Sequence, residues 1–184
     1  EHALQNAWSA QDPLLKTQGN FNNLIGLPLS LLPLNAGHQV AIMEMGMNAL
    51  GEIAALTDIA DPDVGCINTV HPAHLEGLGS IENVAKAKGE LFERMRPEAR
   101  RIVNFDDTRI YALGKRFDGN LIGFAATKAG RKRKATVQVT RLTNLGENGI
   151  LFTLNIGTWK RRITVPVMGE YNAGNCASAA ALTY

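Results

Sequence analysis

A lysine lies on the apolar side of a predicted helix. In residues 81–95 the apolar side chains recur with helical spacing, and Lys88 falls on the same stripe as Val84 and Leu91. Lys86 lies about 200° away from Lys88 around such a helix and can reach water. Two interpretations of Lys88 follow. Either its aliphatic stem packs on the stripe while its ammonium group reaches solvent, or its amine faces a cleft and has a function.

Polar side chains follow three predicted strands at the points where the strands end. In open parallel sheets, ligands bind beyond the carboxyl ends of the strands. We therefore expect Glu44, His74 and Lys88 to converge on a site for magnesium, manganese or zinc, because a carboxylate and an imidazole are common metal ligands. Asp106 or Asp107 can instead cap the helix that follows them. The polar residues after the three strands are Glu44; Asn68, Thr69, His71 and His74; and Asn104, Asp106 and Asp107.

Asparagine residues gather in two further segments. Residues 19–28 (GNFNNLIGLP) can form a turn that exposes amides to a phosphate or a sugar, and the alternative is a capped turn. Asn172 and Asn175, in residues 169–175, are three apart and share one face of a helix, so they can contact one planar ligand. Their alternative role is to cap that helix. The asparagines of the first segment are Asn20, Asn22 and Asn23.

Alternating apolar runs and helical patterns in the first two-thirds of the chain predict a parallel sheet wrapped by helices. After Gly130 the apolar residues alternate with period two, and glycines mark hairpin turns. We therefore predict an α/β fold, a mostly parallel sheet flanked by helices, with a small antiparallel sheet attached near residues 135–167. The predicted strands are 40–43, 64–67, 101–103, 121–124, 136–140, 150–154 and 162–165, and the predicted helices include 50–60, with Asn48 as a cap, and 81–95.

Composition limits the class of protein. With 184 residues, 45% hydrophobic and 20% charged, the chain is typical of one soluble globular domain rather than a disordered segment. A net charge of +2 argues against a nucleic-acid binder, and the basic run 131–134 is interpreted as a solvated turn. Cys66 and Cys176 lack metal-ligand spacing, which favours reduced cysteines in a cytoplasmic protein. The sequence has no apolar run of about 18 residues, so no membrane span is predicted.

These clusters, in their order along the chain, resemble the central domain of the Mur ligases, the ATP-dependent amide ligases that build the peptidoglycan stem peptide. The resemblance covers nearly the whole chain. It is most specific for the branch that adds D-alanyl-D-alanine, because that branch shares the His-Leu-Glu-Gly segment and its spacing to Lys88. The matching segments are GNFNNLIGLP (19–28), EMG (44–46) with GEI (51–53), AHLEGLGS (73–80) and AKGELF (87–92).

The resemblance implies a P-loop-type fold and a cytoplasmic enzyme that uses ATP and Mg²⁺ to join D-Ala-D-Ala to UDP-MurNAc-tripeptide. In the family reaction a substrate carboxylate attacks the γ-phosphate of ATP, and the incoming amine displaces the acyl phosphate. Lys88 would carry a carbamate, formed from carbon dioxide, whose oxygens suit a hard cation. The implied roles are Mg²⁺ binding for Glu44, His74 and carbamylated Lys88; UDP-sugar binding for Asn20, Asn22 and Asn23; and adenine binding for Asn172 and Asn175.

The sequence also departs from the family. The phosphate-binding motif G-x-x-x-x-G-K-[ST] does not occur in the 184 residues. Helical patterns without caps at both ends, and the lack of the family's N-terminal UDP-binding and C-terminal domains, predict that residues 1–184 are a truncated central domain. We expect negligible ligase activity from it alone and an unmodified Lys88. Two alternatives stay open, namely an enzyme like folylpolyglutamate synthase or cyanophycin synthetase, and a non-catalytic binding module.

Overall fold

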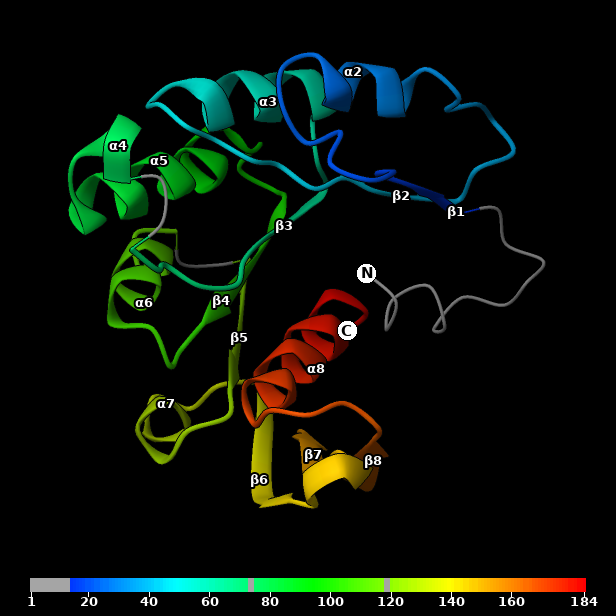
Figure 1. The fold of residues 1–184 in the computed structure, drawn as a ribbon, viewed down its shortest axis with the longest axis vertical. Helices are drawn as coiled ribbons and strands as arrows, with labels where there is room; N and C mark the ends of the chain where they lie inside the picture. The colour runs from blue at the N-terminus through cyan, green and yellow to red at the C-terminus, as the bar shows by residue number, and fades with distance from the viewer. Residues whose placement is uncertain (1–13, 73–74, 118–119) are drawn as a thin grey trace. The chain divides into compact units, whose positions relative to one another are not determined.

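The structure, a computed structural model, describes residues 14–72, 75–117 and 120–184. These residues form two compact units, whose elements are labelled in Figure 1. The first unit contains the described residues up to Gly65 together with 70–99, and the second contains 66–69 and 100–184. Each helix in the described ranges is too short or too polar to cross a membrane.

Helices dominate the first unit. Its elements are β1 (Leu14–Lys16), α2 (Gly26–Leu31), β2 (Val40–Ile42), α3 (Glu52–Ala60), α4 (Leu75–Leu78) and α5 (Ile81–Arg94). Helix α3 packs against both α2 and α5. Two hydrogen bonds of 2.9 and 2.8 Å from the Arg94 guanidinium to the Asp58 carboxylate also join α5 to α3. The fully buried side chains of these three helices include Leu27, Leu56, Val84 and Phe92.

A six-stranded sheet in the order β3-β4-β5-β6-β7-β8 organises the second unit. Strands β4, β5 and β6 pair in parallel, and β6, β7 and β8 pair antiparallel. The elements are β3 (Val64–Ile67, of which Cys66 and Ile67 belong to this unit), β4 (Arg100–Asn104), α6 (Thr108–Gly114), β5 (Leu121–Ala125), α7 (Lys128–Lys132), β6 (Val137–Asn144), the short 3₁₀-helix Gly146–Asn148, β7 (Ile150–Ile156), β8 (Trp159–Val165) and α8 (Tyr171–Leu182).

Helix α8 covers the core of this sheet. Its buried residues Ala173, Ala177 and Ala181 are four apart, so they form one stripe of small side chains on the helix. This stripe packs in one apolar cluster with Phe124 of β5 and Phe152 of β7. Because alanine side chains are small, α8 lies close to the strands. This close packing fixes where the residues of α8 lie relative to the ends of the strands.

Strand β8 lies at one edge of the six-stranded sheet. Lys160, Arg161 and Arg162 are three consecutive exposed cations on it. Charged side chains on an edge strand oppose pairing with a further strand. The sheet therefore ends at β8 with a basic border.

The structure confirms the predicted fold class. The antiparallel strands continue the parallel sheet through the pairing of β5 with β6, as expected for residues 135–167. The prediction was wrong for residues 40–43, which were expected in the main parallel sheet, since β2 pairs in parallel with β1 in a separate two-stranded sheet. Strand β1 has only three residues, too few to show an alternating pattern.

Helix α3 does not begin as predicted. Its N-cap residue is Gly51, which has a left-handed φ of 90°, and not Asn48. Glycine adopts this conformation without the steric cost that a side chain would bring. The Asn48 backbone N–H donates instead to Glu52 Oε2 over 2.6 Å. The cap prediction for Asn48 was therefore wrong. The Glu52 carboxylate, in the first turn of the helix, accepts a hydrogen bond from the backbone of the loop before it.

The basic run 131–134 is not a solvated turn. Arg131 Nη1 donates to the carbonyl oxygens of Ala126 and Val139 over 2.6 and 2.8 Å. Arg133 Nη1 donates to the Phe105 carbonyl over 2.6 Å, and its guanidinium carbon lies 4.4 Å from the centre of the Tyr111 ring. The run therefore contains two arginines that join α7 and the turn after it to neighbouring backbone.

We expect Arg131→Met to lower the free energy of unfolding by about 1–3 kcal/mol, because two backbone carbonyls lose their donor. Urea denaturation followed by circular dichroism measures the change. Lys132→Met is the matched control, since Lys132 is exposed in the same run, and its effect should stay within about 0.5 kcal/mol. Equal effects of the two substitutions would contradict the structural role of Arg131.

Candidate active site

The structure joins the asparagine-rich loop to Glu44. The Asn22 side-chain amide donates to Glu44 Oε1 over 2.8 Å, and the Asn22 carbonyl accepts from Gly46 N over 2.7 Å. The Glu44 backbone N–H donates to Thr17 Oγ1 over 2.9 Å. Glu44 is exposed, and only Met43 separates it from the end of β2. It is therefore a solvent-facing carboxylate whose backbone and side chain are both held by polar neighbours.

Two residues that support Glu44 were not predicted. Thr17 is only 5% exposed. Gly46 leaves room for Asn22, because a Cβ atom at position 46 would lie 3.0 Å from Asn22 Cγ. A threonine after a short apolar run is common in sequences and gives no signal of this role, and Gly46 enters the sequence analysis only as part of the EMG segment, without a contact to Asn22.

The other two asparagines of residues 19–28 have different positions. Asn23 Oδ1 accepts from the backbone N–H groups of Ile25 and Gly26 over 3.1 and 2.8 Å. The capped-turn interpretation is therefore confirmed for Asn23, which holds the start of α2. Asn20 is exposed, and its carbonyl accepts from Asn22 N over 2.8 Å.

Lys88 is half-buried on α5, which begins where predicted. Ser80 is the N-cap residue of this helix, and its Oγ accepts from Asn83 N over 3.1 Å. Two residues beyond Lys88, the Glu90 carboxylate accepts from Gly51 N and Ala54 N over 2.8 and 3.1 Å. Glu90 thus serves the N-terminal amides of α3, where a negative charge is stabilised by the helix dipole. The helix that carries Lys88 is thereby tied to the loop that leads from Glu44 to α3.

The predicted meeting of Glu44, His74 and Lys88 stays a prediction. His74 lies outside the described residues. Among the residues that the structure describes, no three His, Cys, Asp or Glu side chains gather as a metal site. Glu44 and Lys88 belong to the same unit, and Lys88 has an interaction partner in the structure.

Asn172 and Asn175 lie together in the second unit. Asn175 Nδ2 donates to Asn172 Oδ1 over 3.1 Å, which confirms that the two share one face of α8. Asn172 Nδ2 donates to the Met168 carbonyl over 2.8 Å. The N-cap residue of α8 is Glu170, whose side chain makes no capping hydrogen bond. Asn172 thus bonds to a carbonyl before the helix and does not act as its N-cap.

Asn68, at the end of β3, connects these asparagines to the strand ends. Asn68 Nδ2 donates to Asn175 Oδ1 over 2.9 Å. Asn104 Nδ2, at the end of β4, donates to the Asn68 carbonyl over 2.7 Å. Cys66 Sγ lies 3.4 Å from Ser178 Oγ. Cys66 lies on β3 and Asn68 directly follows that strand, while Asn175 and Ser178 are three apart on α8, so one packing contact brings both pairs together.

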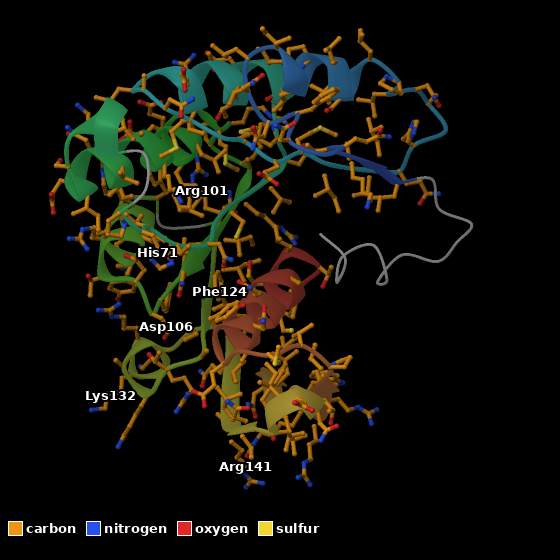
Figure 2. All side chains as sticks on the ribbon, in the orientation of Figure 1. His71, Arg101, Asp106, Phe124, Lys132 and Arg141 are labelled. Atoms are coloured by element: carbon orange, nitrogen blue, oxygen red, sulfur yellow. The ribbon has the colours of Figure 1, made fainter. Side chains whose placement is uncertain are left out.

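Asp106 and Asp107 have mainly structural roles. Asp107 Oδ1 caps α6 by accepting from the backbone N–H groups of Arg109 and Ile110 over 2.8 and 3.1 Å. Asp106, labelled in Figure 2, accepts from Ala126 N over 2.7 Å and from Thr127 Oγ1 over 2.6 Å. The capping interpretation is confirmed for Asp107, and Asp106 joins the loop after β4 to the loop after β5.

Comparison with known sequences identifies relatives over most of the chain. A family profile described as the Mur ligase middle domain matches residues 1–183. The UDP-N-acetylmuramoyl-tripeptide--D-alanyl-D-alanine ligase of Haemophilus influenzae is 34% identical over 181 residues, which are 97% of this chain and 37% of that protein. The ligase of the same name from Escherichia coli is 35% identical over 174 residues, which are 92% and 36% of the two chains.

Solved structures give the same picture. MurF from Acinetobacter baumannii matches 97% of this chain and 38% of its own, with a TM-score of 0.87 and 29% identity. The MurF ligase of Thermotoga maritima, solved in complex with ADP, matches 98% of this chain and 41% of its own, with a TM-score of 0.82 and 25% identity. The chain therefore spans a little over a third of the length of these relatives.

We expect Cys66 to resist alkylation in the folded protein. Burial raises the pKa of its thiol to about 11, against a smaller lowering by the Ser178 hydrogen bond. Only the thiolate reacts, so at pH 8 iodoacetamide should modify Cys66 at least about tenfold more slowly in the folded than in the urea-unfolded chain. Mass spectrometry of the peptides that contain Cys66 and Cys176 measures both rates.

The same pKa sets a pH dependence of stability. Because the folded pKa of Cys66 is raised, its contribution to stability is complete below the unfolded pKa of roughly 8.5 and is lost as pH rises towards 11. Cys66→Ala should remove this part of the alkaline loss of stability.

For the alkylation experiment, rapid modification of folded Cys66 at pH 8 would contradict its burial.

Proposed function

The chain belongs to the Mur ligase family, whose middle-domain profile matches residues 1–183, and from this premise we propose that it is the central catalytic domain of a MurF-type ligase. The complete enzyme is ATP-dependent and adds D-Ala-D-Ala to UDP-MurNAc-tripeptide in peptidoglycan synthesis, in the cytoplasm. The observation that carries the proposal is the joint placement of Glu44, Asn22 and the Lys88 helix within one unit. Relatives of 34% and 35% identity with this ligase name support it.

The proposal assigns the remaining parts of the active site to other residues of the complete protein. Relatives are much longer, since this chain covers 37% of the ligase from Haemophilus influenzae. The phosphate-binding motif is absent from the 184 residues. We infer that this motif, the domain that binds the UDP group and the C-terminal domain are supplied outside residues 1–184.

Glu44, His74 and Lys88 would hold Mg²⁺. The donor chemistry fits, because Glu44 offers an exposed carboxylate oxygen and a carbamate on Lys88 would offer two more oxygens, the ligands that Mg²⁺ prefers. The Asn22 amide holds Glu44 Oε1 over 2.8 Å and so limits the rotation of the carboxylate. When bound, Mg²⁺ would stabilise the negative charge on the transferred phosphoryl group.

The asparagines of the N-terminal loop would contact the nucleotide-sugar in different ways. Asn20 is exposed and would meet it directly. Asn22 would act partly through Glu44, and Asn23 would hold the turn, because its side-chain oxygen already accepts from Ile25 N and Gly26 N. This division of roles refines the expectation that all three lie near the sugar.

Asn172 and Asn175 would bind the adenine of ATP. The two amides are joined by a hydrogen bond of 3.1 Å and lie at the start of α8.

In the reaction, the tripeptide carboxylate attacks the γ-phosphorus, and the bond from that phosphorus to ADP breaks. The dipeptide amine then attacks the acyl carbon, loses a proton and expels phosphate, which leaves the new amide bond.

The function can be tested with the complete protein. Full-length ligase incubated with ATP, Mg²⁺, UDP-MurNAc-tripeptide and D-Ala-D-Ala should release ADP and phosphate and form the pentapeptide product, measured by chromatography. Residues 1–184 alone should give negligible turnover, because the backbone amides and the lysine of the phosphate-binding loop are missing. Inactive full-length protein would contradict the function, and turnover by residues 1–184 would contradict the division into domains.

Lys88→Ala in the full-length ligase should lower kcat at least about a hundredfold, because the carbamate support of the metal ion is lost. Short carboxylic acids added to this variant should restore part of the rate. Lys86→Ala is the matched control, since Lys86 is exposed on the same helix, and its rate should be unchanged. An unaffected rate for Lys88→Ala would favour the interpretation that its stem packs while its ammonium group reaches solvent.

A further inference from the structure

Resting on the adenine-binding role of Asn172 and Asn175, we propose that Asn68 is a positioning residue that fixes the amide of Asn175 and thereby selects adenine over 6-oxopurines. Asn68 follows β3 and reaches Asn175 from a different element of the fold. Its contribution is orientation: it determines which end of the Asn175 amide donates and which accepts.

From Asn68 onward, the side-chain hydrogen bonds run in one direction. Asn104 Nδ2 donates to Asn68 O over 2.7 Å, and Asn68 Nδ2 donates to Asn175 Oδ1 over 2.9 Å. Asn175 Nδ2 then donates to Asn172 Oδ1 over 3.1 Å, and Asn172 Nδ2 donates to Met168 O over 2.8 Å. From Asn68 to Asn172, each side-chain amide therefore presents its NH₂ group to the oxygen of the next group, an arrangement in which successive hydrogen bonds polarise one another. The Asn104 bond ends on the backbone of Asn68 and holds that residue in place.

This series of side-chain amides ends on the backbone carbonyl of Met168, which can only accept a hydrogen bond. Asn172 must direct its NH₂ group to Met168 O, so its Oδ1 faces Asn175. Asn175 must then direct its NH₂ group to Asn172 and its Oδ1 to Asn68. Rotating the Asn175 amide by half a turn would place oxygen against oxygen on one side and NH₂ against NH₂ on the other.

The fixed amide matches one purine edge. An amide has two N–H donors and two acceptor lone pairs. The bonds to Asn68 and Asn172 use one of each from Asn175, which is exposed, so the other N–H and lone pair can meet a base. An asparagine amide pairs with adenine by accepting from the 6-amino group and donating to a ring nitrogen. Hypoxanthine and guanine carry an oxygen at this position, which would oppose the amide oxygen.

The position of Asn68 is itself well determined. Its backbone carbonyl is held by Asn104, whose Oδ1 in turn accepts from Asp106 N over 2.8 Å. Two residues earlier, Cys66 lies 3.4 Å from Ser178 on α8. These contacts come from β4 and α8, so Asn68 is held from both sides at the end of its strand.

The test uses the full-length ligase and the isosteric substitution Asn68→Asp, with initial rates measured for ATP and for ITP. The new carboxylate would oppose Asn175 Oδ1 and favour the rotated amide, which accepts where it previously donated. We expect the ratio of kcat/KM for ATP to that for ITP to fall about tenfold, because a bidentate contact discriminates between bases by this order. The change should come from a higher KM for ATP, with the KM for UDP-MurNAc-tripeptide unchanged.

Asn144→Asp is the matched control. Asn144 is exposed at the end of β6, where its Oδ1 accepts from Gly146 N over 2.8 Å, a bond that aspartate can also accept. This control should keep the wild-type ATP-to-ITP ratio. Asn68→Ala, which removes the donor without adding an acceptor, should lower the ratio less than Asn68→Asp does and serves if the aspartate variant does not fold.

The outcomes separate this inference from the proposed function. Wild-type ligase that forms product from ATP supports the function, and inactive wild-type enzyme contradicts it. In an active enzyme, a fall in the ATP-to-ITP ratio confined to the Asn68 variants supports the positioning role. An unchanged ratio together with a lowered melting temperature would overturn it and leave Asn68 a structural residue only.

Discussion

Several backbone N–H and C=O groups in the loops that follow strands pair with short polar side chains, and the candidate site depends on these pairings. Buried or half-buried backbone groups need such partners almost without exception. Asn104 bonds the Asn68 carbonyl, and Asp106 bonds Ala126 N and Thr127 N. The same side chains that satisfy the backbone thereby set the position of the residues assigned to nucleotide binding.

A similar principle operates in the first unit. Glu90 serves the N-terminal amides of α3, while Thr17 accepts from Glu44 N and Asn22 donates to the Glu44 carboxylate. An exposed carboxylate with fixed neighbours loses less conformational freedom when a cation binds, so less of the binding energy is spent on ordering it. Because the Asn22 amide is neutral, it positions the Glu44 carboxylate without cancelling the negative charge that attracts a cation.

Much of the fold could be predicted from the sequence because apolar periodicity is a local signal. The helix of Lys88, the strands of the main sheet and the antiparallel extension all followed from spacing. The two-residue alternation that identified β6 and β7 was absent from β1, and the pairing of β1 with β2 depends on contacts between distant segments.

The candidate site was predictable in its residue types but not in its contacts. Asn22 and Glu44 were each named, yet their hydrogen bond joins residues 22 positions apart. Asn68 was recognised only as a polar residue after a strand, since the contact with Asn175 spans 107 positions. The basic run was misinterpreted because composition shows a charge but not the carbonyl that it meets, as at Arg131.

The basic border formed by β8 has a consequence for self-association. Its three consecutive exposed cations would face the same three charges if the β8 edges of two copies approached one another. Their mutual repulsion is strongest in dilute buffer and is screened over a Debye length of about 8 Å at physiological ionic strength. Raising the salt concentration therefore weakens the barrier to edge-to-edge growth, so this sheet is better protected from aggregation at low ionic strength than at high.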